Sequence, residues 1–232
     1  RRLQGWYGAV AFRFSDITAS GAAHAGSTSL ALLRQGIAIT SSRHLHVCAN
    51  ATEVFPSLFT SGCRVMTFYV DTGSQRLLED CFGKTTGVTL IESMLHEAKK
   101  AGLKTIVRLT YPTPADDYHT REETLRLLSR TKPDYVYVAL PEVHARSVWF
   151  AHADRFGYWL PAKFVSEPWV YSRTRFPLPV DRWRNPPYRV GALAASQVVH
   201  EQENLIAAAH QLGINTQIDD IPVLLAHLSA ED

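Results

Sequence analysis

Residues 65–84 read VMTFYVDTGSQRLLEDCFGK, and this stretch decides the fold. Its first part, 65–70, is a largely apolar run of the length expected for a strand that is buried on both faces. Polar residues follow at once, with the carboxylate of Asp71 and then Ser74, a residue type that often begins helices. Residues 75–82 predict the helix that follows. Polar groups therefore lie at the carboxyl end of a strand, where parallel α/β proteins bind their ligands.

The same stretch resembles the G-V-E-S-G-S … L … K-x-T segment of radical S-adenosylmethionine enzymes, in particular the branch whose longer members carry a cobalamin-binding domain. Asp71 stands where the family usually has Glu, and Tyr69 stands where it usually has Gly. Lys84 and Thr86 match the K-x-T end of the segment. The resemblance implies that Asp71 contacts the methionyl amine or the ribose of S-adenosylmethionine. It also implies that Lys84 pairs with the methionyl carboxylate and that Ser74 donates a hydrogen bond.

Other segments resemble the same family in the same order along the chain. Phe14 and Asp16 match part of an F-x-D-D-x-F segment, which implies that Asp16 contacts the cofactor. An Asp that only caps the following turn is the alternative for Asp16. Arg43 matches an arginine that follows the next strand of the family, where contact with a substrate or carboxylate is expected.

Residues 111–128 resemble the family segment G-F-P-G-E-T … T-L-x-L-L. Pro114 keeps the family proline and Asp116 takes the place of its glutamate, so both are expected to border the adenine. Pro112 and Ala115 replace the two glycines of the segment. In the family those glycines allow the backbone to approach the adenosine closely.

The strand predicted at 133–140, PDYVYVAL, resembles the P-D-x-V-x-V strand of the family. It is followed by Glu142 and His144, where family members tend to have a P-G-T-P turn. Because this chain lacks that turn, Glu142 and His144 are candidates for substrate contacts specific to this protein. Ordinary loop polarity is the alternative.

The spacing of the predicted strands indicates one parallel sheet. Strands are expected to begin near residues 9, 37, 65, 105 and 135, with a helix between each pair. Such spacing suits right-handed crossovers in an α/β fold, but it provides too few units for a closed eight-stranded barrel. The resemblance implies the partial TIM-like (β/α) barrel of six units that radical S-adenosylmethionine enzymes use. The predicted parts are the partial barrel at 1–157, a Pro-, Arg- and aromatic-rich connector at 158–189, and a C-terminal helical extension at 190–232.

Two helix starts are predicted from capping residues. Thr120 and Glu123 have the spacing of a capping box. Asp220 is expected to cap a last helix that runs to residue 228, with Pro222 in its first turn.

The three cysteines, Cys48, Cys63 and Cys81, suit neither a disulfide framework nor a closely spaced metal site. Reduced thiols of this kind are typical of cytoplasmic proteins. The family holds a four-iron cluster through a C-x3-C-x2-C motif, which is absent here. The chain begins with Arg1 rather than Met, so we expect it to be a C-terminal portion of a longer enzyme whose cluster ligands precede it. The resemblance implies S-adenosylmethionine and a 4Fe-4S cluster as cofactors, and cobalamin as well in some of the longer parent enzymes. It also implies that this portion alone does not catalyse a reaction.

The composition is that of an ordinary globular protein. The chain has 232 residues, 46% of them hydrophobic, and a formal charge of +2, so nothing demands a nucleic acid partner. No apolar run approaches the roughly 20 residues that span a bilayer. The expected partner is a small-molecule substrate. A sheet that lacks one neighbouring strand would also expose an edge, which favours self-association.

Two other functions remain open. A degenerate barrel could bind a ligand or partner without catalysis, which the lost glycines and Asp71 in place of Glu favour. A metal-dependent barrel hydrolase is the other alternative, because alternation puts His44 and His46 on one face of a strand. No carboxylate and His at the later strand ends complete that metal site.

Overall fold

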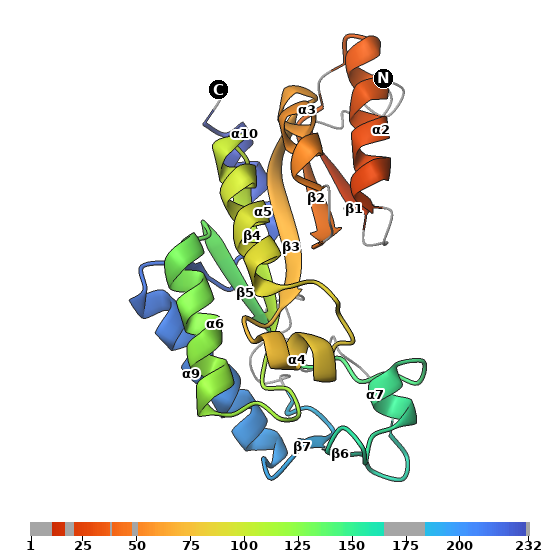
Figure 1. Cartoon of the computed structure of the whole chain (residues 1–232), viewed down its shortest axis with the longest axis vertical. Coiled ribbons are helices and arrows are strands. Elements are labelled where there is room, and N and C mark those ends of the chain that lie inside the picture. The colour runs from red at the N-terminus through yellow and green to blue at the C-terminus, as the bar shows by residue number, and fades with distance from the viewer. Residues whose placement is uncertain (1–10, 17–20, 38, 48–50, 165–183, 231–232) are drawn as a thin grey trace.

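The computed structural model describes residues 11–16, 21–37, 39–47, 51–164 and 184–230. A six-stranded sheet forms its centre, in the order β1-β2-β3-β4-β5-β8, and every neighbouring pair is parallel (Figure 1). The strands are β1 (Phe12–Asp16), β2 (Ser41–His46), β3 (Cys63–Asp71), β4 (Lys104–Thr110), β5 (Tyr135–Ala139) and β8 (Asn215–Thr216). The predicted α/β fold with a partial (β/α) barrel is therefore confirmed.

Helices cover one face of this sheet. They are α2 (Gly21–Arg34), the 3-10 helix η1 (Ala51–Val54), α3 (Phe55–Thr60), α5 (Val88–Lys100), α6 (Tyr118–Thr131) and α9 (Ala195–Gln211). Because successive side chains of a strand alternate, the even-numbered Met66, Phe68 and Val70 of β3 face this helical layer. They pack with Ile91 and Met94 of α5, and all five side chains are almost fully buried. The main hydrophobic core therefore lies between the sheet and these helices.

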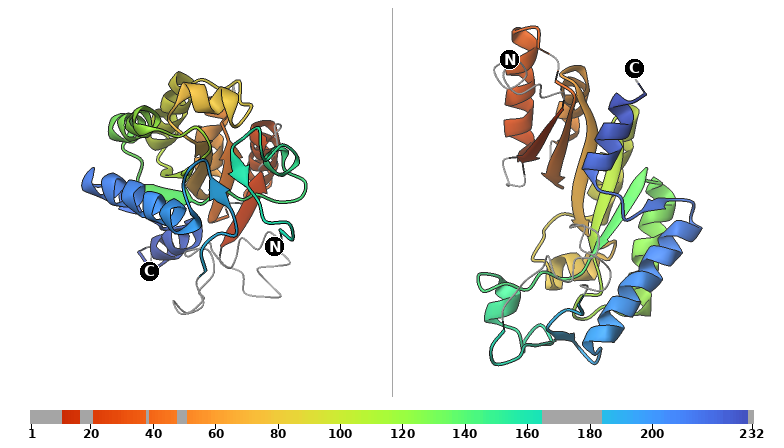
Figure 2. Two further views of the ribbon diagram at one scale, coloured as in Figure 1. Left: turned by 90° about the horizontal axis from the view of Figure 1, so that it is seen from below. Right: turned by 180° about the vertical axis from the view of Figure 1, so that it is seen from behind.

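The opposite face of the sheet, which we call the inner face, carries α10 (Asp220–Leu228) (Figure 2). Val65, Ile106 and Tyr137 lie on this face and pack with Val223 and Leu224 of α10. Since Val65 and Ile106 stand near the starts of their strands, α10 covers the amino-terminal half of the inner face. No helix of the described residues is long and apolar enough to cross a bilayer.

Several short elements were not predicted from the sequence. They are α7 (Val148–Ala151), the antiparallel pair β6 (Tyr158–Trp159) and β7 (Arg189–Val190), and the edge strand β8. Elements of two to four residues carry too little periodicity to be recognised. Most of the predicted connector, 165–183, lies outside the described residues. At the other edge of the described sheet, β1 pairs with β2 alone, and self-association along that edge stays a prediction.

The predicted capping box at the start of α6 needs correction. The capping box of α6 joins Asp117 and Thr120, not Thr120 and Glu123. The Asp117 carboxylate accepts from the Thr120 amide and the Thr120 hydroxyl accepts from the Asp117 amide, both at 2.9 Å. The helix begins earlier because Asp117 satisfies its first free amides. Ser74 is at the N-cap position of α4 (Gln75–Asp80), but its hydroxyl makes no capping hydrogen bond.

The turn between β3 and α4 packs directly on the backbone of α6. The amide of Gly73 donates to the Thr124 hydroxyl at 2.9 Å. A Cβ atom added at Gly73 would lie 2.5 Å from the Cα of Thr124. Only glycine fits here, since the atom in the way belongs to a helix backbone and cannot rotate aside.

Gly73→Ala is expected to lower the free energy of unfolding by about 1 to 3 kcal/mol, because α4 and α6 must move apart. Gly87→Ala is the matched control, since an added Cβ there meets nothing closer than the Gln75 side chain at 3.6 Å. The control should cost about 0.5 kcal/mol, for the weaker N-cap. Urea denaturation followed by circular dichroism measures both variants. Equal losses in the two variants would contradict the close approach of this turn to α6.

Candidate functional site

Charged side chains meet at the carboxyl ends of β3 and β4. Asp71 ends β3 in a left-handed backbone conformation, with φ of 70°. Its carboxylate lies 2.5 Å from the Nζ atom of Lys84 and accepts a hydrogen bond of 3.1 Å from the Thr110 hydroxyl. Lys84 Nζ also donates to the carbonyl oxygen of Tyr69 at 2.9 Å. The structure thus brings together Asp71 and Lys84, two of the residues predicted to bind the cofactor.

The end of α4 places Lys84 next to β3. Gly83 adopts the left-handed conformation, with φ of 61°, and the amide of Lys84 donates to the carbonyl of Leu78 at 2.8 Å. This reversal is a common helix ending that glycine permits. It turns the chain back towards the strand from which it came, so that Lys84 reaches Asp71.

A row of planar side chains crosses the inner face beside this ion pair. His46, Tyr69, Arg108 and Tyr137 are neighbours in register on β2, β3, β4 and β5. The rings of His46 and Tyr69 are 5.3 Å apart, and the Arg108 guanidinium lies 5.3 Å from the Tyr69 ring and 5.1 Å from the Tyr137 ring. Glu142 lies 3.4 Å from Arg108, so one of the three predicted substrate contacts borders this row.

The ionisation of His46 is set by its position in this row. Burial lowers the pKa of His46, and the nearby Lys84 ammonium lowers it further, whereas Asp71 acts in the opposite direction. His46 therefore stays neutral to a lower pH than an exposed histidine does.

Asp220 is the residue at this face that the sequence did not reveal. The N-cap of α10 is Asp219, whose carboxylate accepts from the Asp220 amide at 2.8 Å, so the predicted cap is wrong by one residue. Asp220 is fully buried and reaches β2 instead, where its Oδ2 atom accepts from the Ser42 hydroxyl and lies 3.0 Å from His44 Nε2. Arg13 Nε lies 3.1 Å from the same oxygen. The sequence did contain a signal for this second role, because two adjacent aspartates precede the helix and only one of them can be its N-cap.

The pKa of Asp220 follows from these contacts. Burial alone would raise the pKa, but hydrogen bonds that involve His44, Asp219 and Ser42 lower it well below its usual range. Asp220 is therefore a buried carboxylate at neutral pH.

His44 and His46 both lie on the inner face, as alternation predicts, but they do not share a metal site. In the described part of the chain, the side chains close enough to hold an ion together are His44, Asp219 and Asp220, within 4.8 Å of one another. His46 is not among them. The guanidinium of Arg13 already neutralises Asp220, so this geometry does not support the metal-dependent hydrolase.

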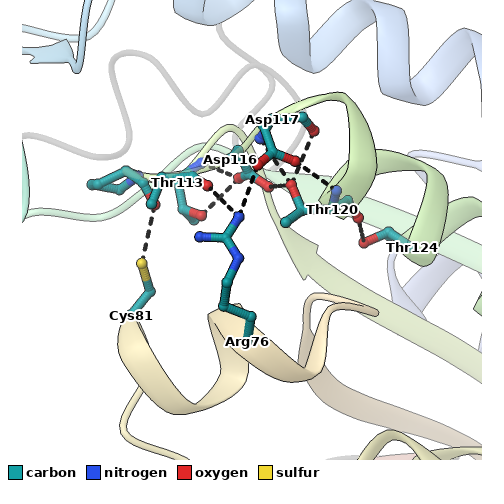
Figure 3. Close-up of polar contacts among 9 residues, drawn as sticks. Arg76, Cys81, Thr113, Asp116, Asp117, Thr120 and Thr124 are labelled. Atoms are coloured by element: carbon teal, nitrogen blue, oxygen red, sulfur yellow. Dashed lines mark hydrogen bonds and ion pairs between the residues drawn. The ribbon is translucent and has the colours of Figure 1, made fainter.

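The loop predicted to border the adenine is held by its own hydrogen bonds (Figure 3). One carboxylate oxygen of Asp116 accepts from the amide and hydroxyl of Thr113, at 2.6 and 2.7 Å. The other oxygen accepts from the Thr120 hydroxyl at 3.0 Å. Burial raises the pKa of Asp116, and these hydrogen bonds oppose the rise. Because both oxygens are occupied within the loop, Asp116 has a structural role here.

Side chains of α4 and of the residue that ends it also hold this loop (Figure 3). Arg76 donates to the carbonyl of Ala115 at 3.1 Å and pairs with Asp117 at 2.9 Å. The Cys81 thiol donates to the carbonyl of Pro114 at 3.0 Å. Pro114 itself lines two pockets of about 440 and 580 Å³, and neither is lined by Asp71 or Lys84. Pro114 is thus at the same end of the sheet as the ion pair but faces other cavities.

Three more predicted site residues lie away from the ion pair or are buried beside it. Arg43 is 2% exposed and lies 4.3 Å from the ring of Phe14, because odd-numbered residues of β2 face the helices. The exposed His144 precedes α7, and its carbonyl accepts from Ser147 at 2.8 Å. Neither position supports the predicted substrate contact. Ser74 is fully buried, and its hydroxyl has no hydrogen-bond partner among the described residues. The side chain of Asp16 lies outside the described part of the structure.

Comparison with known proteins identifies the fold. No family model and no curated protein matches the sequence. Coproporphyrinogen III oxidase (HemN) from Escherichia coli, a radical SAM enzyme, is similar with a TM-score of 0.52 and 15% identity, over 81% of this chain and 36% of that chain. The radical S-adenosylmethionine methyltransferase TsrM from Kitasatospora setae, with cobalamin and a [4Fe-4S] cluster bound, is also similar. It gives a TM-score of 0.54 and 14% identity, over 87% of this chain and 40% of that chain.

The protein therefore has the fold of radical S-adenosylmethionine enzymes, as the sequence motifs indicated. It spans 36 to 40% of the length of these two solved chains.

The described cysteines do not fit the iron–sulfur cluster of such enzymes. Cys63 begins β3, at the end of the strand opposite to Asp71, and burial raises the pKa of its thiol to about 11. Burial, Asp116 and Asp80 raise the pKa of Cys81 to about 11 as well. Cys48 lies outside the described residues. Protonated thiols that are far apart cannot supply three thiolates to one cluster.

Both described thiols should be inert in the folded protein. With a pKa of about 11, each is a thiolate in about one molecule in a thousand at about pH 8. Iodoacetamide should leave Cys63 and Cys81 unmodified in the native protein and alkylate both in urea, as measured by peptide mass spectrometry. Rapid native alkylation of Cys81 would contradict its hydrogen bond to Pro114.

Ala115, at the position of a family glycine, has a left-handed backbone conformation, with φ of 64°. A side chain in this left-handed region costs about 1 to 2 kcal/mol, part of which is offset by the lower entropy of the unfolded chain. Ala115→Gly should therefore raise the free energy of unfolding by about 0.5 kcal/mol. The control Ala207→Gly, at an exposed position of α9, should lower it by about 1 kcal/mol. Destabilisation by both changes in urea titrations would rule out strain at Ala115.

Proposed function

We propose that the inner face binds S-adenosylmethionine at its carboxyl end and that the chain is part of a radical S-adenosylmethionine enzyme. The observation that carries the proposal is the Asp71–Lys84 ion pair at the strand ends of this fold. The methionyl end of the cofactor bears one ammonium and one carboxylate. Lys84 and Asp71 offer the complementary charges, and their side chains are only 20% and 15% exposed. Charges shielded from water to this degree attract one another more strongly than exposed ones.

Binding would exchange partners rather than add an unpaired charge. Without ligand, Lys84 neutralises Asp71, and Thr110 holds the second carboxylate oxygen of Asp71. With ligand, the methionyl ammonium faces Asp71 and the methionyl carboxylate faces Lys84. Each charge then keeps an opposite partner, which is the condition for placing ions in a partly buried site.

The row of His46, Tyr69, Arg108 and Tyr137 is proposed as the neighbouring surface for a small-molecule substrate, with Glu142 at its border. In a complete enzyme of this kind, a 4Fe-4S cluster would supply the electron for cleavage of S-adenosylmethionine. Its ligands would come from outside this chain, so the chain alone is proposed to bind but not to catalyse. Cobalamin in the parent protein is part of the same proposal, supported by the likeness to TsrM.

A barrel that binds a ligand without catalysis is the second candidate. Two replacements of family glycines favour this candidate. Tyr69 replaces one of them at the inner face, and Ala115 replaces the other in the loop before α6. This candidate uses the same site, and it differs from the first in having no cluster in the parent chain.

Isothermal titration calorimetry with S-adenosylmethionine tests the site directly. Lys84→Ala should weaken binding at least about tenfold, since a loss of about 1.4 kcal/mol is modest for a shielded charge pair. Lys104→Ala is the matched control, because Lys104 also pairs with an aspartate, Asp134 at 2.9 Å, but at the start of β4. The control should bind within about twofold of wild type, which is the size of a remote surface effect.

Two results would overturn the proposal. One is no binding by the wild-type protein, and the other is equal weakening by both lysine variants. Thermal unfolding of Lys84→Ala separates loss of binding from loss of fold.

A further inference from the structure

A continuous hydrogen-bond chain crosses the inner face from α10 to β3. The buried carboxylate of Asp220 lies 3.0 Å from His44 Nε2. The other ring nitrogen of His44, Nδ1, lies 3.2 Å from the hydroxyl of Tyr69. His44 is 2% exposed and Asp220 is fully buried, whereas Tyr69 is half-buried in the row beside the Asp71–Lys84 pair. The chain therefore connects a buried carboxylate with the proposed ligand site.

The proton positions follow from the charge of Asp220. A carboxylate only accepts hydrogen bonds, so the His44 nitrogen that faces it must carry a proton. In neutral His44, Nδ1 is then an acceptor, and the Tyr69 hydroxyl donates to it. The Arg13 Nε–H group lies within hydrogen-bond distance of His44 Nε2, at 3.0 Å, and Arg13 Nε also forms an ion pair with Asp220 at 3.1 Å. A carboxylate is the stronger acceptor, so we assign the Arg13 proton to Asp220. The opposite tautomer would require Arg13 to donate to His44.

The arrangement has the order of a carboxylate, an imidazole and a hydroxyl, each bonded to the next. In such an order the imidazole takes the hydroxyl proton, and the carboxylate orients the ring and stabilises the resulting cation. Among the described residues, the charged or titratable neighbours of the chain include Arg13 on β1, His46 on β2, Lys84 after α4, Arg108 on β4 and Asp219 before α10. The Arg108 guanidinium lies 5.3 Å from the centre of the Tyr69 ring.

We propose that Tyr69 is an acid–base residue of the inner-face site and that His44 and Asp220 are its positioning residues. A ligand with an ionisable O–H or N–H group gives its proton to the Tyr69 oxygen as the Tyr69 proton passes to His44 Nδ1. The ligand becomes one unit more negative, His44 becomes an imidazolium, and Asp220 balances that charge. The reverse transfer returns the proton, so no oxidant or other reactant is needed.

This inference rests on the inner face being the ligand site, but not on S-adenosylmethionine being the ligand. Tyr69 stands where the resembling family has glycine, so its hydroxyl is a feature of this chain rather than of the fold. The tests below use no ligand, and their failure is therefore distinct from failure of the cofactor-binding proposal.

The first test is nitrogen-15 NMR of the wild-type protein labelled at histidine. His44 should show a protonated Nε2 and an unprotonated, hydrogen-bonded Nδ1, and Tyr69→Phe should shift the Nδ1 signal alone. A wild-type His44 protonated at Nδ1 would overturn the proposal, because that nitrogen could not take the Tyr69 proton. Stoichiometric zinc bound at His44 in purified protein would overturn it as well.

The second test measures the Tyr69 phenolate from the ultraviolet absorbance difference between wild type and Tyr69→Phe. At about pH 7, ionisation to solvent is negligible for a tyrosine, so a Tyr69 phenolate is present there only where its proton has passed to His44. Asp220→Asn removes the charge that stabilises the His44 cation and should reduce this phenolate about tenfold. The matched control is Asp219→Asn, which removes a charge one residue away and keeps a good N-cap, and it should change the signal less than about twofold. An unchanged signal in Asp220→Asn would overturn the role of Asp220. If that variant does not fold, the NMR test on wild type still decides the proposal.

Discussion

The alternation of side chains along β3 is the constraint on which the rest of the structure depends. Met66, Phe68 and Val70 join the main core with the helices, so Val65, Tyr69 and Asp71 must point to the inner face or its rim. A shift of one residue would bury the Asp71 carboxylate among apolar side chains. Burial of the apolar residues against the helices thus directs the alternate, polar residues to the inner face. The strands paired with β3, namely β2 and β4, divide their side chains between the two faces in the same way.

The inner face can hold charged side chains because its buried charges have opposite partners. This pairing occurs in two places along the strands. Near the strand starts, α10 brings the Asp220 carboxylate to Arg13 and His44. At the strand ends, Lys84 neutralises Asp71. An isolated ion in either place would cost several kcal/mol in lost hydration. Tyr69 lies between the two groups through its contacts with His44 and Lys84, so the inner face forms one connected polar system.

Two predicted site residues make internal contacts in the structure, and the reason is common to both. Arg43 and Asp116 are polar residues at the positions that family motifs assign to ligands, yet the structure uses both internally. Arg43 is on the helical side of β2, over Phe14, and the Asp116 carboxylate closes its own loop through Thr113. A sequence motif indicates that a residue lies near a strand end, but it does not indicate which groups its side chain contacts. Those partners depend on strand parity and on local hydrogen bonds, which compete with a ligand.

The sequence by itself determined the parallel α/β architecture, because the apolar run at 65–70 and the recurrence of strand and helix are local patterns. It also placed Asp71 at the end of a strand, and the family resemblance implied that Lys84 shares a site with it. Only the tertiary structure decided that Asp220, 151 positions from Tyr69 along the chain, shares a hydrogen-bond chain with it through His44. The pairing arises from packing α10 on the inner face, and such long-range contacts leave no periodic signal in the sequence.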